Sequence, residues 1–272
     1  MIRAGRFSAR LDGRAVSVTT SLLLAALVVF CVNISVGDFN IPFVDVLKYL
    51  IGDGNKDSEF IIGRLRLPRS LTGLLVGAAL GLSGAIFQSI ARNPLASPDV
   101  IGVTAGASAF AVAMIIIGPT NDLISDVARN SVSIAALFGG LFTALMVYLL
   151  AYRRGLVGYR LVLVGIGISA MMTSVISYLM TRATLYEASR ATVWLTGSLN
   201  GRGWHHVRPV TAALVVLVPC TMMLSRHLRA LQLGDDTARA LGSRTEWARL
   251  GLIVCGVGLA ALATASAGPV AF

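Results

Sequence analysis

The sequence has 272 residues, of which 56% are hydrophobic and only 13% are charged. Soluble domains usually carry about 25% charged residues, so this composition excludes an ordinary globular protein. The net charge of +10 comes from arginines dispersed between apolar stretches, not from one basic patch, which argues against a nucleic-acid-binding protein.

Seven uncharged stretches are long enough to cross a membrane as helices. Six have 21 residues or more and the seventh has 17. About 20 residues span the hydrocarbon core of a bilayer at 1.5 Å per residue. The stretches are residues 15–37, 70–91, 100–121, 130–152, 161–181, 209–225 and 250–272. The sequence therefore predicts an all-α polytopic membrane protein, with residues 1–272 forming a single transmembrane domain.

The distribution of basic residues predicts the orientation of these spans. With a cytoplasmic N-terminus, 13 of the 23 lysines and arginines fall on the inner side, which also carries the larger net positive charge. Cytoplasmic loops are enriched in lysine and arginine. We therefore expect a multi-pass protein of the plasma (inner) membrane with its N-terminus in the cytoplasm.

Small residues recur at four-residue spacing in the second and third stretches. Gly73, Gly77 and Gly81 fall on one face of the second stretch, and Gly102 and Gly106 repeat the pattern in the third. Glycines at this spacing allow another helix to approach closely. The pattern predicts helices packed inside a larger bundle.

A polar break separates these two stretches. It reads RNPLASPD and contains Pro94 and Pro98. Proline is unfavourable inside a helix, and it also biases the preceding residue away from helix. We expect a helix, a tight polar turn and a second helix.

Two outer segments carry shorter apolar pieces. Residues 42–51 have apolar side chains at helical spacing, which predicts a short helix at the outer membrane interface. Residues 191–201 are apolar but too few to span, so an interfacial or partly inserted helix is expected there.

Motifs of enzymes and of ion-coupled carriers are missing from the sequence. The only lysines, Lys48 and Lys56, do not follow glycine as a phosphate-binding loop requires, and HExxH, CxxC and GxSxG do not occur. The predicted membrane spans contain no acidic or basic residue, whereas secondary carriers usually keep such groups at mid-membrane. We predict no catalytic residue and no directly bound metal or cofactor. A secondary carrier and an integral membrane enzyme remain the rival classes.

Four blocks of sequence carry a resemblance to a known family. They are residues 64–106 with Gln88 and the turn RNPLASPDVIG, WLTGSLNG at Trp194–Gly201, LQLGDDTARALG at Leu231–Gly242, and AGPVAF at Ala267–Phe272. Together they resemble the permease subunits of ATP-driven importers for iron–siderophore complexes and cobalamin, especially the ferric enterobactin kind. Such permeases have about ten helices and continue past AGPVAF. The resemblance therefore implies a C-terminally truncated chain.

The resemblance implies a docking site on the outer side. In the family, arginines of the RLPR element meet glutamates of a solute-binding protein, and the matching positions are Arg66 and Arg69. The planar fork of arginine suits such bidentate pairing with carboxylates. Snorkelling of these side chains to the membrane interface is the alternative.

A second implied site is cytoplasmic. The family's coupling helix, which docks into a groove on the ATPase, matches Leu233, Gly234, Asp235, Asp236, Ala238, Leu241 and Gly242. The alternative is a surface helix resting on lipid headgroups. Two adjacent acids would be unfavourable beside an anionic leaflet.

The third candidate site is the uncharged stretch of residues 161–181. Hydroxyls spaced four apart, at Ser169, Thr173 and Ser177, are expected on one helix face. They can bond back to their own helix or to a neighbouring helix. In the family, the corresponding helix lines the transport pathway.

The resemblance also implies the partners. These are ATP-binding subunits that use the ATP, a second permease chain that is identical or homologous, a periplasmic or lipid-anchored solute-binding protein, membrane lipid and a ferric siderophore cargo. Nucleic acid is not expected. Cobalamin or haem remains the alternative cargo.

Overall fold

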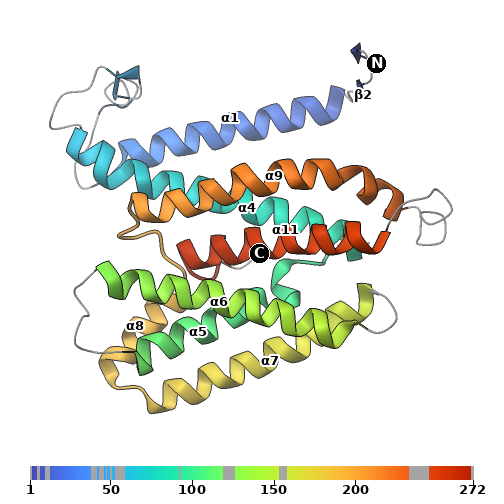
Figure 1. Ribbon diagram of the computed structural model, residues 1–272. Coiled ribbons are helices and arrows are strands. Elements are labelled where there is room, and N and C mark those ends of the chain that lie inside the picture. The colour runs from blue at the N-terminus through green and yellow to red at the C-terminus, as the bar shows by residue number, and fades with distance from the viewer. Residues whose placement is uncertain are drawn as a thin grey trace. The chain divides into compact units, whose positions relative to one another are not determined.

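The computed structural model describes residues 2–4, 7–9, 13–37, 42, 46, 48–49, 51–52, 59–91, 93–118, 126–152, 158–232 and 245–270 (Figure 1). The chain divides into two compact units, residues 1–70 and 71–272. Each unit has its own buried apolar residues.

The first unit contains one long helix and the beginning of another. Strands β1 (Ile2–Ala4) and β2 (Phe7–Ala9) form a short antiparallel pair ahead of helix α1 (Gly13–Ser35). A π-helical segment, η1 (Glu59–Arg66), leads directly into helix α4 (Leu67–Ala91), whose first four residues belong to this unit. The end of α1 contacts η1.

Three fully buried side chains hold this unit together. Its core is formed by Ile34 of α1, by Ile62 of η1 and by Val46, which precedes η1 in the chain. The Ser70 hydroxyl donates to Asn33 Oδ1 over 2.7 Å, which adds a polar tie between α4 and α1. Half of the residues in the predicted helix over residues 42–51 are described, and four of them are helical, namely Val46, Lys48, Tyr49 and Ile51.

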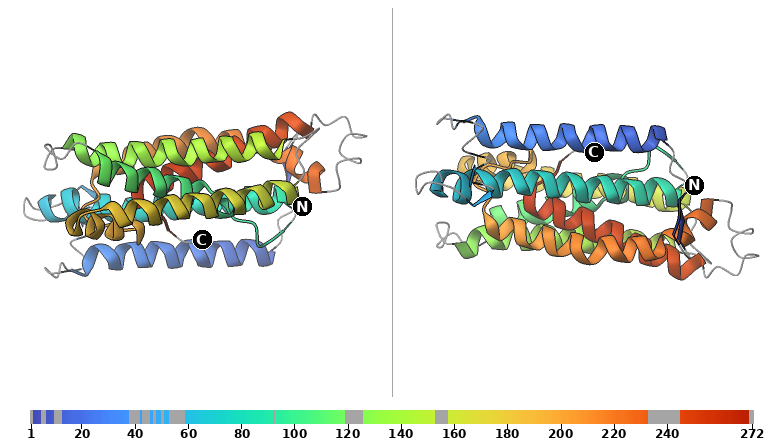
Figure 2. Two further views of the ribbon diagram at one scale, coloured as in Figure 1. Left: turned by 90° about the horizontal axis from the view of Figure 1, so that it is seen from below. Right: turned by 90° about the horizontal axis from the view of Figure 1, so that it is seen from above.

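The second unit is a bundle of helices. Its elements are the rest of α4, the 3₁₀ turn η2 (Pro98–Ile101), α5 (Val103–Ile117), α6 (Asp126–Ala151), α7 (Gly158–Arg182), α8 (Leu185–Leu195), α9 (Trp204–Gln232) and α11 (Thr245–Ala267). Figures 1 and 2 show its long helices running roughly along one direction. Helix α5 packs against α6 and α7, and α11 packs against α9, α6 and α5.

The described helices confirm a multi-pass membrane protein. Six are long and apolar enough to cross a bilayer. The third predicted span, residues 100–121, is shorter than expected because α5 has only 15 residues. Pro98 starts a 3₁₀ turn, and Gly102 then adopts a left-handed φ of 80°, so the α-helix begins only at Val103.

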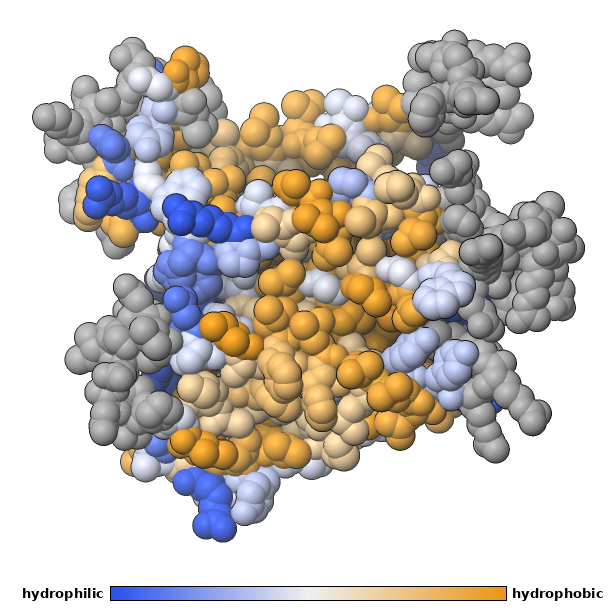
Figure 3. All heavy atoms as spheres, viewed as in Figure 1, coloured by the Kyte–Doolittle hydropathy of each residue, from blue (hydrophilic) through white to orange (hydrophobic). Residues whose placement is uncertain are grey.

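Apolar side chains cover the outside of this bundle. In the lower half of Figure 3 they spread across the face formed by α6 and α7, and hydrophilic residues gather toward the left edge. Exposed members include Leu145 and Leu149 of α6 and Leu163 and Ile166 of α7. Apolar surface on this scale is suited to contact with lipid.

Helix α11 lies at the centre of the second unit. In its most apolar window 72% of the residues are buried, against 22% in α7 and in α9. Its small residues allow close neighbours: a Cβ on Gly256 would lie 3.0 Å from the Phe87 ring, and the Ser83 hydroxyl donates to Gly256 O over 2.7 Å. These contacts join α4 to α11.

Helices α5 and α6 cross closely. A Cβ on Gly106 would collide with Thr143 and would lie 2.6 Å from Gly139 O, and a Cβ on Gly139 would lie 2.5 Å from Gly106 O. The prediction of close packing is confirmed at Gly106. It is not supported at Gly77 and Gly81, where no described atom lies within 4 Å of an added Cβ.

Candidate functional site

A groove opens at the junction of α1, η1 and α4 within the first unit. Its volume is about 680 Å³, and it is lined by Asn33, Val36, Gly37, Phe60, Ile61, Leu65, Arg66 and Arg69. Phe60 and Leu65 are each 56% exposed. Both arginines predicted to dock a binding protein thus border one concave surface, beside exposed apolar side chains.

The two arginines differ in their surroundings. Arg66 is half-buried, and its Nη1 donates to Ile34 O at 2.8 Å and to Ser35 O at 3.1 Å. These carbonyls end α1, so the cation also complements the negative end of the helix dipole. Arg69 is exposed. No local pattern in the sequence indicates the bonds of Arg66, because its partners lie more than 30 residues away along the chain.

The α7 hydroxyls separate into two groups. Thr173 and Ser177 are exposed, and they donate to the carbonyls of Ser169 and Thr173 at 2.9 and 3.1 Å. The Ser169 hydroxyl is buried beside Gly102. All three residues share the four-residue spacing, but η2 and α5 pack against α7 and bury the Ser169 hydroxyl, while Thr173 and Ser177 stay exposed. A pathway role for this face stays a prediction.

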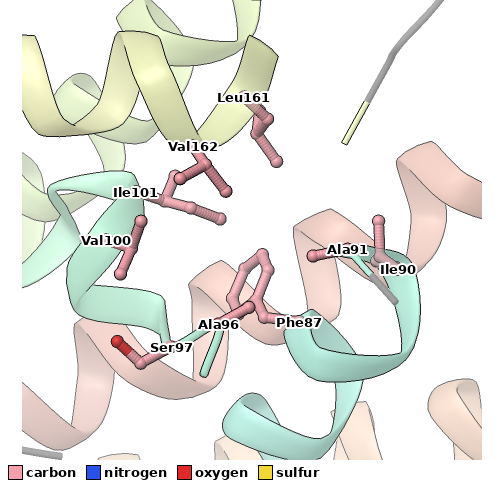
Figure 4. A pocket seen from close by; sticks show the side chains of 9 residues that line it. All are labelled: Phe87, Ile90, Ala91, Ala96, Ser97, Val100, Ile101, Leu161 and Val162. Atoms are coloured by element: carbon pink, nitrogen blue, oxygen red, sulfur yellow. The ribbon is translucent and has the colours of Figure 1, made fainter. Parts of the chain in front are cut away.

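The polar break between α4 and α5 folds back into the bundle. It surrounds a small pocket of about 10 Å³ into which the Phe87 ring points, with Val100 and Ile101 of η2 and Leu161 of α7 around it (Figure 4). Such a space holds at most about one water molecule. The turn is therefore a packing element and leaves no room there for a cargo.

The predicted coupling segment lies outside the described residues. Leu233, Gly234, Asp235, Asp236, Ala238, Leu241 and Gly242 all fall between the end of α9 at Gln232 and the start of α11 at Thr245. In Figure 1 both helix ends lie at the right, opposite α8. The role of these residues stays a prediction.

Helix α8 differs from the predicted helix over residues 191–201. It starts six residues earlier, at Leu185, and ends at Leu195. Thr184 and Glu187 form a capping box: Thr184 N–H donates to Glu187 Oε2 at 2.9 Å, and Glu187 N–H donates to Thr184 Oγ1 at 3.4 Å. The Thr-x-x-Glu spacing was the signal that could have located this start. Gly197, with φ 70°, follows its end.

The capping box predicts how α8 responds to mutation and to pH. The bonds from Thr184 hold the pKa of Glu187 below its ordinary value. A lowered carboxyl pKa stabilises the folded form above the ordinary value, and this support is lost as the pH falls through the lowered pKa. We expect Thr184→Ala to speed amide exchange in the first turn of α8.

Hydrogen exchange with mass spectrometry checks this expectation, with rates normalised to the unfolded peptide at each pH. Glu187→Gln should remove the additional loss of protection at acidic pH. Equal protection of the first turn in the parent and in Thr184→Ala would contradict the role of the cap.

Two of the sequence blocks that carried the resemblance meet in the second unit. The main-chain N–H of Ser198, in WLTGSLNG, donates to the carbonyl of Ala267, in AGPVAF, over 2.8 Å. The sequence did not predict this contact, since the residues are about 70 positions apart. Among the described residues, no group of three or more His, Cys, Asp or Glu comes together as metal ligands would.

Comparison with known proteins places this architecture in a family. Residues 23–272 match the model of the FecCD transport family. The ferric enterobactin transport system permease protein FepG of Escherichia coli (strain K12) is 40% identical over 261 residues, which cover 95% of this chain and 77% of FepG. The achromobactin transport system permease protein CbrC of Dickeya dadantii (strain 3937) is 36% identical, over 99% of this chain and 76% of CbrC.

A third relative and a solved structure agree with this family assignment. The iron(3+)-hydroxamate import system permease protein FhuG of Bacillus subtilis (strain 168) is 34% identical, over 92% of this chain and 74% of FhuG. A structure described as an inward-facing conformation of a metal-chelate type ABC transporter matches with a TM-score of 0.79 and 25% identity, over 94% of this chain and 77% of that one. By family model, sequence and fold, the chain belongs to the FecCD transport family.

Proposed function

We propose that this chain is the membrane-spanning permease subunit of an importer that moves an iron–siderophore complex across the inner membrane. The observation that carries the proposal is the agreement of the relatives. FepG, CbrC and FhuG match over at least 92% of this chain, and they are permeases of the ferric enterobactin, achromobactin and iron(3+)-hydroxamate transport systems. The bundle of apolar helices supports the same function.

The partners follow from this assignment. A pair of separate ATPase subunits supplies the energy, and a solute-binding protein delivers the cargo on the outer side. A second permease chain, identical or homologous, completes the channel. The N-terminus lies in the cytoplasm, as the distribution of basic residues indicates.

Docking of the binding protein takes place at the groove of the first unit. Arg69 supplies an exposed cation at its rim, and Arg66 borders it while holding the end of α1. Exposed Phe60 and Leu65 supply apolar contact area. Carboxylates on the partner would pair with the guanidinium groups, as arginine favours.

Charge reversal tests this site. Arg66→Glu with Arg69→Glu should weaken binding-protein association by about a hundredfold and make the residual binding less sensitive to salt, because attraction becomes repulsion. Surface plasmon resonance at several salt concentrations measures both effects. Arg208→Glu, which reverses a single charge at an exposed position on α9, is the control. Unchanged affinity in the double variant would refute docking at the groove.

The cargo class is tested by transport in cells. A strain lacking its own siderophore permeases receives this permease with its ATPase and binding protein, and is offered ferric catecholate, ferric hydroxamate, ferric citrate, haem and cobalamin. We expect uptake of a ferric siderophore. Uptake of only haem or only cobalamin would replace the proposed cargo, and no uptake of any would contradict the importer.

A further inference from the structure

Two main-chain segments interlock at the α8 end of the second unit. Ser198 N–H donates to Ala267 O over 2.8 Å and links the two segments, while Gly268 N–H donates to Thr264 O over 2.8 Å and closes the last turn of α11. We call the contact of residues 197–198 with residues 267–269 the clasp. It joins the segment that leaves α8 to the segment that leaves α11.

Two glycines allow the clasp to close. Gly197 and Gly268 have left-handed φ values of 70° and 84°. A Cβ on Gly197 would lie 2.7 Å from Pro269 O, and one on Gly268 would lie 2.9 Å from Trp194 O. Both obstacles are main-chain atoms, so a change of side-chain rotamer cannot relieve either clash. The clasp therefore needs glycine for conformation and for space.

Side chains attach the clasp to the neighbouring helices. Trp194, near the end of α8, packs against the buried cluster that contains Ala107 of α5 and Ala265 of α11. Arg202 Nε donates to Ser198 O at 3.0 Å, and its Nη1 lies 2.8 Å from His206 Nε2 on α9. Because arginine only donates, His206 Nε2 is the acceptor. The ends of α8, α9 and α11 are thereby fastened together.

Helix α11 connects the clasp at its C-terminal end with the proposed ATPase contact before its N-terminal end. Helix α11 is continuous from Thr245 to Ala267 and is the most buried of the six long helices. It starts directly after residues 233–242, which we propose contact the ATPase. Helix α8 follows α7 directly, beyond the exposed hydroxyls of Thr173 and Ser177. The clasp is therefore linked through α11 to the proposed ATPase contact, and through α8 to the end of α7 and the proposed pathway.

From these contacts we infer that the clasp stays closed throughout transport and makes α8 move with α11 as one body. A displacement at the cytoplasmic end of α11 then reaches α8 at the outer end of the α7 face. Gly197 and Gly268 are positioning residues in this device. The inference rests on the proposed function, because it takes the segment before α11 as the point where the ATPase acts.

Hydrogen exchange in the assembled importer tests whether the clasp stays closed. The permease, with its ATPase and binding protein in lipid nanodiscs, is compared without nucleotide, with ATP and vanadate, and with ADP. We expect peptides covering residues 196–202 to keep the same slow exchange in all three states. Loss of protection in any one of them would mean that the clasp opens, and would overturn the inference.

Glycine substitutions test whether the clasp transmits motion. Gly268→Ala should lower cargo uptake per ATP hydrolysed by about tenfold, since overpacking of the usual size shifts an equilibrium by about that factor. Gly201→Ala is the matched control: Gly201 has a similar φ of 68°, but no described atom lies within 4 Å of an added Cβ. Gly201→Ala should therefore keep most of its uptake per ATP.

Uptake and ATP hydrolysis are both measured on importer purified as the assembled complex, so a smaller yield of folded permease does not change their ratio. Equal ratios in Gly268→Ala, Gly201→Ala and the parent would overturn the transmission role. Failure of the parent importer to take up any ferric siderophore would instead count against the proposed function. The exchange measurement would still report on the clasp in that case.

Discussion

Gly106→Ala is expected to destabilise the permease by about 2 kcal/mol or more, because it overpacks the close crossing of α5 and α6 in the second unit. The added methyl group would collide with Thr143 and would lie 2.6 Å from Gly139 O. Thr143 is itself fixed, since its hydroxyl donates to Gly139 O at 2.7 Å and the side chain is fully buried. Only separation of α5 from α6 would make room.

Thermal unfolding of the detergent-solubilised permease, followed by size-exclusion chromatography, measures this effect. Gly77→Ala is the control, because no described atom lies within 4 Å of its added Cβ and alanine favours helix. Thr143→Ala in the Gly106→Ala background should recover part of the lost stability. Equal melting temperatures for the Gly106→Ala and Gly77→Ala proteins would show that α5 and α6 do not cross this closely.

Changes in the segment before α11 are expected to abolish transport while leaving the permease folded. Asp235→Lys with Asp236→Lys, or Gly242→Val, should lower ATP-driven uptake by about a hundredfold, as the loss of a buried charged contact at an interface would. Neither change lies in one of the six helices able to span the membrane. Membrane insertion and the yield of folded protein should therefore match the parent.

Proteoliposomes containing the ATPase separate coupling from catalysis. Basal ATP hydrolysis should persist while uptake is lost. Asp99→Lys, within η2, provides a comparison of charge reversal away from the segment. Normal uptake in the Asp235→Lys/Asp236→Lys and Gly242→Val proteins would show that residues 233–242 do not couple the permease to the ATPase.

The membrane helices could be predicted from the sequence because the bilayer imposes a simple length rule. Uncharged stretches of about 20 residues mark α1, α4, α6, α7 and α11 within a few positions. The same rule failed for α5, because it counts apolar residues and does not register the 3₁₀ turn and the left-handed Gly102 ahead of Val103.

The candidate sites were only partly predictable. Arg66 and Arg69 were singled out as a pair, yet only the fold reveals that Arg66 holds the carbonyls that end α1. Ser169 shares its spacing with Thr173 and Ser177, but its hydroxyl is buried because α7 packs there against Gly102, just ahead of α5. The clasp depends on two main-chain approaches between segments far apart in the chain, and local sequence patterns carry no information on such contacts.

We conclude that this FecCD-family chain forms the membrane path of an ATP-driven iron–siderophore importer. The most direct test is uptake of radiolabelled ferric siderophore into proteoliposomes that contain the permease pair and its ATPase. We expect uptake that requires both ATP inside and the loaded binding protein outside. Uptake that persists without ATP and responds to an ion gradient would contradict the claim.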